Sequence, residues 1–173
     1  MEKKVTGKQN QGRNCFVCGV NNESGLHGEF FELEDGTLVG LFRPKFHHQS
    51  YPGRVHGGII TAMLDATIGR AVQIADPDAW GVTAELTTRY LKPVPYDVDL
   101  RVTGRITRDS RLLFIGEGEI LLPDGTVAAR ATAKYAKLPL YSIGDLNAEG
   151  DSWEKYPRDS DPVYIDMPEA ESK

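Results

Sequence analysis

Apolar and polar residues alternate through most of the second half of the chain, a pattern typical of half-buried β-strands. Between the last two such runs, Pro123-Asp124-Gly125 is a strong turn signal. Short connections make antiparallel neighbours, so we predict four consecutive strands in one sheet. The predicted strands span 81–91, 98–106, 111–122 and 126–138, and in the first of them Val82, Ala84, Leu86, Thr88 and Tyr90 share one face.

The first half of the chain contains two further strand-like runs and one long apolar stretch. The runs LHGEFFEL and TLVGLFRP flank Glu34-Asp35-Gly36, which is a hairpin signal. A polar and aromatic loop follows at residues 45–55. We predict a helix over about 57–75 that is apolar on most faces and that ends at Asp76-Pro77.

One apolar helix among antiparallel strands predicts an α+β fold, because a helix that is apolar on most faces must be enclosed. A curved antiparallel sheet wrapped around a long central helix satisfies this need. We assign residues 25–138 to this domain, residues 1–24 to a flexible N-terminal segment and residues 139–173 to an acidic, partly disordered C-terminal tail. Aromatic residues such as Trp153 leave open that the tail is anchored to the domain.

Charge and composition narrow the classes of partner. The 173 residues carry a net charge of −5, of which residues 139–173 contribute −6 and the rest +1. A nucleic-acid partner is therefore not expected, because it needs a clustered basic face. No apolar run approaches the roughly 18 residues of a membrane span, and the polar N-terminus lacks the features of a signal peptide. We expect a cytoplasmic protein without membrane contact.

Two cysteines, Cys15 and Cys18, form a CxxC motif in a segment rich in Gly and Asn. A structural zinc site needs four ligands, and the sequence holds no second CxxC. We therefore interpret the pair as reduced cysteines in a turn, with a metal or redox role as the alternative. No metal and no cofactor is expected.

One carboxylate, Asp65, interrupts the predicted helix. Its neighbours three and four positions away are Thr61, Ala62, Ile68 and Gly69, so no cation of the same helix balances its charge. A buried, unpaired carboxylate is costly, and such groups tend to be functional or paired across the fold. Asp65 is therefore a catalytic candidate, and an ion pair with a strand or a solvent-facing position is the alternative.

Two glycines, Gly57 and Gly58, lie at the start of the same helix. The first amides of a helix have no partner within it and lie at the positive end of its dipole. Glycine leaves these amides open to a carbonyl oxygen, so they could form an oxyanion hole. Tight packing of the preceding loop is the alternative reason for the two glycines.

The spacing of these groups restricts how they can cooperate. Eight residues separate Gly57 from Asp65, which corresponds to about 12 Å along a helix. A single carbonyl group cannot contact both groups of one helix. If both act in one reaction they come from two chains, which predicts a two-fold homodimer with two shared sites.

Three segments carry a resemblance to a known family: CFVCGVNNESGLHGEF, then H-x-x-x-x-G-x-x-HGGIITAMLD, then GVTAELTTRYLKPV. Over residues 14–138 the chain resembles the PaaI-type hotdog-fold acyl-CoA thioesterases. The resemblance implies a hotdog fold, in which a curved antiparallel sheet wraps a long helix. It also implies a homodimer or a tetramer that is a dimer of dimers, and hydrolysis of an acyl-CoA to a free acid and CoA.

The resemblance also implies site residues by position. Gly57 is similar to the oxyanion amide, and Asp65 of the partner chain to the general base or nucleophile. Thr83 matches a hydroxyl that holds the attacking water, while His56 either contacts the thioester or hydrogen-bonds at the helix start. Ser50 stands where many relatives have Asn. The candidate substrate contacts are Gly58, His48 and three cations suited to CoA phosphates, Arg54, Arg89 and Lys92.

Two other functions remain open at this level. The loop HHQSYPGRV resembles the histidine loops of hotdog hydratases and dehydratases, which act on acyl thioesters without releasing CoA. A non-catalytic acyl-CoA-binding protein is the second alternative, because fold does not fix function.

Overall fold

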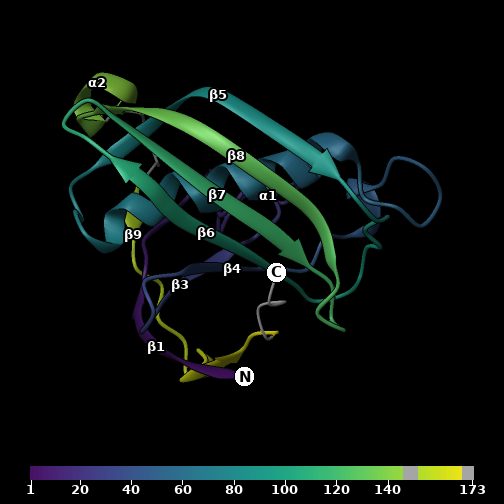
Figure 1. The fold of residues 1–173 in the computed structure, drawn as a ribbon. Coiled ribbons are helices and arrows are strands. Elements are labelled where there is room, and N and C mark those ends of the chain that lie inside the picture. The colour runs from purple at the N-terminus through teal and green to yellow at the C-terminus, as the bar shows by residue number, and fades with distance from the viewer. Residues whose placement is uncertain (146–151, 169–173) are drawn as a thin grey trace.

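A curved antiparallel sheet encloses one long helix in the computed structural model, which describes residues 1–145 and 152–168 (Figure 1). The helix α1 spans Gly57–Arg70 and continues as the 3₁₀ turn η2, Ala71–Ile74. This confirms the predicted α+β class and central helix. The other elements are β1 Glu2–Lys8, β2 Gln11–Gly12, β3 Glu29–Leu33, β4 Leu38–Phe42, η1 Phe46–His48, β5 Trp80–Tyr90, β6 Leu100–Asp109, β7 Leu113–Leu121, β8 Val127–Leu138, α2 Leu140–Ile143, β9 Trp153–Glu154 and β10 Tyr164–Asp166.

The main sheet has the strand order β10-β1-β3-β4-β6-β7-β8-β5. The strands β6, β7 and β8 are consecutive antiparallel neighbours, as predicted. The expected pairing of β5 with β6 is wrong, because β5 pairs with β8 and β6 pairs with β4. Residues 91–99 carry the chain between these distant positions, and their two prolines cannot donate to a ladder. As a result, β5 is an edge strand.

The helix α1 lies directly on a set of glycines in the sheet. A Cβ atom on Gly104 of β6 would come within 2.6 Å of the carbonyl oxygen of Thr67. Cβ atoms on Gly116 and Gly118 of β7 would overlap the Ile68 side chain at 2.6 and 2.8 Å. Only glycine permits this close approach, so these positions set the distance between α1 and the sheet.

Alternation along the strands produces two apolar cores, one on each face of the sheet. The larger core lies on the helix side and includes Phe30 of β3, Leu38 of β4 and the apolar residues of α1. A smaller core on the opposite face includes the adjacent residues Phe31 and Val39, and β10 covers it with Ile165. The C-terminal segment is therefore part of the folded protein.

The prediction that residues 1–24 form a flexible segment is wrong for β1, which pairs with β3 on one side and β10 on the other. Likewise, β9 of the predicted tail pairs with β2, and Gly12 lies opposite Trp153. Neither segment has an apolar pattern that predicts a strand, because each forms its strands by hydrogen-bonding to the other. Residues 146–151 and 169–173 of the predicted tail lie outside the described residues.

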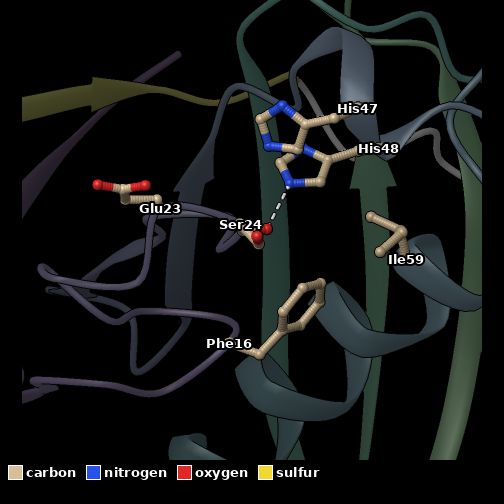
Figure 2. Close-up of a pocket in the computed structure, with 6 residues that line it drawn as sticks. All are labelled: Phe16, Glu23, Ser24, His47, His48 and Ile59. Carbon is tan, nitrogen blue, oxygen red and sulfur yellow. Dashed lines mark hydrogen bonds between the residues drawn. The ribbon is translucent and has the colours of Figure 1, made fainter.

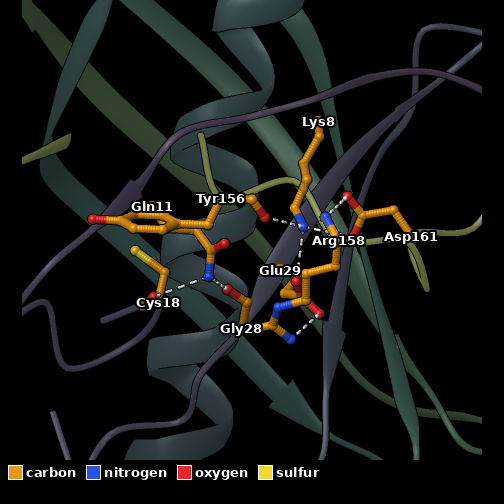
Figure 3. Close-up of polar contacts among 8 residues, drawn as sticks. All are labelled: Lys8, Gln11, Cys18, Gly28, Glu29, Tyr156, Arg158 and Asp161. Carbon is orange, nitrogen blue, oxygen red and sulfur yellow. Dashed lines mark hydrogen bonds and ion pairs between the residues drawn. The ribbon is translucent and has the colours of Figure 1, made fainter. Parts of the chain in front are cut away.

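An ion cluster holds the two terminal segments together (Figure 3). The Lys8 ammonium donates to the Glu29 carboxylate at 2.9 Å, the Asp161 carboxylate at 2.6 Å and the Tyr156 carbonyl. Arg158 adds an ion pair with Glu29 at 3.3 Å. The Lys8 side chain is only 9% exposed, so this cluster is screened less than a surface pair.

No helix in the described part of the chain is long and apolar enough to cross a membrane.

Replacing Gly104 with alanine tests the seating of the helix. The added methyl group meets helix backbone, which cannot rotate away, so we expect Gly104→Ala to lower the free energy of unfolding by about 1–3 kcal/mol. Gly144→Ala is the matched control, because a Cβ there meets nothing within 4 Å. Urea denaturation measures both variants. Equal midpoints for the two variants would show that the glycines do not set the helix position.

Candidate active site

The start of α1 leaves one backbone amide available. His56 is the N-cap, with extended backbone, and its Nδ1 accepts the Gly58 amide at 2.9 Å. The next two amides, of Ile59 and Ile60, donate to the His56 carbonyl. Within the described residues, the Gly57 amide alone among these four has no acceptor. Gly57 thus fits an oxyanion donor, whereas His56 and Gly58 are occupied with each other in the helix cap.

The lack of a side chain at Gly57 is not required by packing within its own chain. A Cβ there would meet the Tyr90 ring at 3.5 Å, an ordinary contact. The Tyr90 hydroxyl donates to the Gly57 carbonyl at 3.1 Å and also lies 2.8 Å from the Thr61 hydroxyl. These bonds fix the first turn of α1 to the edge strand β5, so the free amide has a defined position.

Two hydroxyl groups from neighbouring strands hold the Asp65 carboxylate. Thr83 of β5 donates to Oδ1 at 2.8 Å, and Tyr135 of β8 donates to the same oxygen at 3.1 Å. Tyr135 also lies 3.0 Å from the Asp65 carbonyl. Among the described residues, no Lys or Arg pairs with Asp65, and Oδ2 accepts no hydrogen bond. The carboxylate is thus oriented while one oxygen stays available.

A β-bulge brings Thr83 to this position. The register of β5 against β8 shifts between Thr83 and Glu85. After the bulge, Leu86 packs into the helix-side core and Thr88 bonds to α1, but before it the helix-facing residue is Thr83. The predicted face with Val82 and Ala84 is therefore wrong at its beginning. A bulge changes which face each residue occupies, and the alternation pattern does not reveal it.

Tyr135 is the residue of this site that the sequence did not single out. Its ring is buried and stacks on Phe114 with centroids 4.8 Å apart. Burial, followed by the negative charge of Asp65, raises the pKa of Tyr135 well above its ordinary value, so its hydroxyl remains a donor. Tyr135 faces Thr83 across the ladder. The only signal in the sequence is a tyrosine, with its polar hydroxyl, at a position of β8 where the pattern predicts a buried apolar residue. Its partner, Asp65, can be recognised only in the folded structure.

The loop before α1 uses His48 as a structural residue. Its Nδ1 accepts the Lys45 amide at 2.8 Å, and its Nε2 donates to the Ser24 carbonyl at 3.0 Å. Burial is the main cause that lowers the pKa of His48 below its ordinary value. With both nitrogens occupied, His48 is poorly suited to the proton transfer of a dehydratase. Ser50 is exposed and its amide donates to the Arg54 carbonyl, so the structure gives it a loop contact only.

A pocket of about 510 Å³ opens beside the start of α1 (Figure 2). Ile59 contributes from the first turn of the helix, and Phe16 contributes from the N-terminal region, with its ring edge-on to His48. The remaining lining residues are Glu23, Ser24, His47 and His48. Both apolar and polar groups line this pocket, and Ile59 places one side of it at the first turn of α1.

The three predicted phosphate contacts do not share one surface. Arg54 and Lys92 are exposed on adjacent segments, since the Val55 amide donates to the Val94 carbonyl. Arg89 lies opposite Arg130 in the ladder, one position from the helix-facing Thr88, so it points to the other face of the sheet. The geometry therefore groups Arg54 and Lys92 near the helix start and separates Arg89 from them.

The amino-acid sequence is similar to those of known thioesterases. Residues 52–129 match the thioesterase superfamily. Acyl-coenzyme A thioesterase THEM4 of Mus musculus is 32% identical over 138 residues, which are 79% of this chain and 57% of that protein. The chain spans about half the length of the THEM4 relatives that it matches.

Solved structures share the fold. Protein RHA08564, a thioesterase superfamily protein, is 29% identical, with a TM-score of 0.64 over 72% of this chain and 60% of that one. The Escherichia coli PaaI protein gives a TM-score of 0.59 at 16% identity, covering 65% of this chain and 80% of its own. Protein smu.793 of Streptococcus mutans, solved bound to acetyl CoA, gives 0.58 at 22% identity and covers 65% and 89%. The predicted hotdog fold is confirmed.

The pKa of His48 predicts a pH dependence of stability. Because folding lowers this pKa, the folded state favours neutral imidazole, and the stabilisation is complete above the unfolded value of about 6.5. It is lost as pH falls through the lower folded value. We expect the free energy of unfolding to fall between about pH 7 and pH 5, and His48→Gln to weaken this dependence. His47→Gln, which changes the exposed neighbour, is the control, and equal slopes in all three proteins would contradict this assignment.

Proposed function

We propose that this chain, of which residues 52–129 match the thioesterase superfamily, is an acyl-CoA thioesterase that hydrolyses an acyl-CoA to a free acid and CoA. The observation that carries the proposal is the pair of groups on α1: a helix-start amide without an acceptor among the described residues, and a carboxylate held by two hydroxyls. The name of the mouse relative and the acetyl-CoA bound to the S. mutans protein support this substrate class.

The site is shared between two chains in this proposal. Gly57 and Asp65 lie eight residues apart on a single straight helix, so about 12 Å separates them along its axis. Two antiparallel helices related by a two-fold axis would bring Gly57 of one protomer to Asp65 of the other. The edge strand β5 pairs on one side with β8, and its side chains bond to both residues, Tyr90 to Gly57 and Thr83 to Asp65, which suits it to an interface.

Hydrolysis follows from the roles of these groups. The Gly57 amide polarises the thioester carbonyl and stabilises the oxyanion that forms when water attacks. Asp65 accepts the proton of that water through its available oxygen, and collapse of the intermediate expels the CoA thiolate, which takes up a proton. As a nucleophile, Asp65 would instead form an anhydride that water then cleaves. Thr83 and Tyr135 hold the carboxylate in either route.

The substrate lies along the start of α1 in this arrangement. Arg54 and Lys92 are the cations placed to meet CoA phosphates, and they act as charged, exposed contacts. The pocket between Phe16 and Ile59 takes part of the bound molecule near the reacting carbonyl. Arg89, on the other face of the sheet, is left out of this substrate path.

A proline at position 57 tests the oxyanion amide. Gly57 is the first helical residue, where proline is well tolerated, and Gly57→Pro replaces the amide hydrogen with a ring carbon. Loss of one oxyanion donor should lower kcat by about 10²–10³-fold. Gly57→Ala keeps the amide and is the matched control. Free-thiol release from a panel of acyl-CoAs measures both variants, with circular dichroism as a check on folding. Equal activity of the two variants would exclude this amide from the reaction.

Asp65→Asn tests whether the carboxylate takes part in hydrolysis. Co-expressed with Gly57→Pro, it also tests whether each site is built from two chains. We expect the nearly isosteric change to lower kcat by about a hundredfold or more. Co-expressing Asp65→Asn with Gly57→Pro should restore about a quarter of wild-type activity. About half of the dimers then contain one chain of each kind, and each such dimer has one intact site out of two.

Failure of the mixture to regain activity, with mixed dimers verified by tags, would contradict the two-chain site. If the wild type binds acyl-CoA but releases no thiol, the binding-protein alternative replaces the thioesterase. Hydration of an enoyl-CoA without release of CoA would favour the hydratase alternative.

A further inference from the structure

The two cysteines lie at the opposite end of α1 from Gly57 and take no part in the chemistry proposed above. Cys15 and Cys18 begin and end a single turn, in which the Gly19 amide donates to the Cys15 carbonyl at 2.7 Å. Both are free thiols, Cys15 half-buried and Cys18 fully buried. Both side chains converge on Gly12: its amide lies 3.2 Å from the Cys18 sulfur, and a Cβ atom there would come within 2.9 Å of the Cys15 Cβ.

A mostly buried cation lies against this pair. The Arg70 guanidinium, in the last turn of α1, donates to the Cys18 sulfur at 3.0 Å and to the Asn10 carbonyl at 2.6 Å. It also stacks on the rings of Phe30 and Trp153, 4.3 and 4.9 Å from their centroids. No carboxylate of the described residues forms an ion pair with Arg70. A buried cation needs an opposite charge, and the thiol pair is the group placed to supply it.

The two sulfur atoms have different surroundings. The Cys18 sulfur accepts from Arg70 at 3.0 Å and from the Gly12 amide at 3.2 Å. The neighbouring Cys18 thiol is the main cause that lowers the pKa of Cys15, and the Cys15 side chain, followed by burial, raises the pKa of Cys18. Because Cys15 is half-buried and Cys18 is fully buried, Cys15 is the sulfur that a small reagent can reach and the one that attacks.

From this arrangement we propose that Cys15 and Cys18 form a reversible dithiol–disulfide site, in which Arg70 stabilises the reactive thiolate and small-molecule disulfides are the oxidant. Phe16 of the same turn lines the pocket described above, but neither cysteine does. The test reads the thiols themselves and does not depend on hydrolysis. The motif occupies a turn against the end of a helix, and the half-buried position of Cys15 leaves a path for a small reagent.

The oxidation proceeds by two exchanges that balance. The Cys15 thiolate attacks one sulfur of the small disulfide, forming a mixed disulfide and expelling one thiolate. Cys18 then gives its proton to that thiolate and attacks the Cys15 sulfur, so the Cys15–Cys18 disulfide forms and the second small thiolate leaves. The protein loses two electrons and the small disulfide gains them. Arg70 then faces neutral sulfur, so reduction restores its counter-charge.

Two measurements on the full chain test the proposal. The first is the rate of alkylation of each cysteine by iodoacetamide between about pH 4 and pH 9, read by peptide mass spectrometry. We expect Cys15 to react with a midpoint below the ordinary thiol value of about 8.5, and Cys18 to be protected. Arg70→Gln should raise the Cys15 midpoint, whereas Arg70→Lys, which keeps the charge, should raise it less.

The second measurement is the intact mass after incubation with oxidised glutathione. We expect the wild type to lose two hydrogens without gaining an adduct, and Cys18→Ser to accumulate one glutathione on Cys15. Cys15→Ser should resist modification, because its remaining thiol is buried. Urea-unfolded wild type serves as the positive control for the oxidant. A folded wild type that stays reduced while the unfolded control oxidises, or an ordinary midpoint for Cys15, would overturn the proposal.

Discussion

The close contact between α1 and the glycines of β6 and β7 is the constraint on which the other features depend. Gly104 and Gly118 let the helix lie on the sheet without intervening side chains. At this distance a short carboxylate at position 65 reaches hydroxyls on β5 and β8, and a hydroxyl on Tyr90 reaches the first turn. A helix held further from the sheet would break each of these bonds, so packing and chemistry have one geometric origin.

The same helix carries three separate polar environments along its length. At its beginning, a histidine cap occupies the Gly58 amide and leaves the Gly57 amide available, at the positive end of the dipole. In its middle, Asp65 is oriented by strand hydroxyls. At its end, Arg70 lies where the dipole favours a cation, against the Cys18 sulfur and two aromatic rings. The apolar faces between these points pack against the sheet and keep the environments apart.

The terminal segments stabilise one another and cover what the central domain leaves open. β10 covers the small apolar core on the outer face, and Trp153 covers Arg70 and the cysteine turn. The Lys8 cluster joins the two segments through charges that are far apart in sequence. Because neither segment is apolar enough to form structure alone, their order depends on pairing with each other and with β3.

The sequence determined the features that depend on local pattern. Apolar periodicity predicted the central helix and most strands, turn signals predicted the hairpins, and the spacing of Gly57 and Asp65 restricted how they can act together. The tertiary structure decided what depends on pairing between distant segments. The position of β5 beside β8, the bulge that turns Thr83 toward Asp65 and the bond from Tyr135 all follow from a ladder between residues about 50 apart. Strand register is a property of two segments together, and neither segment records it alone.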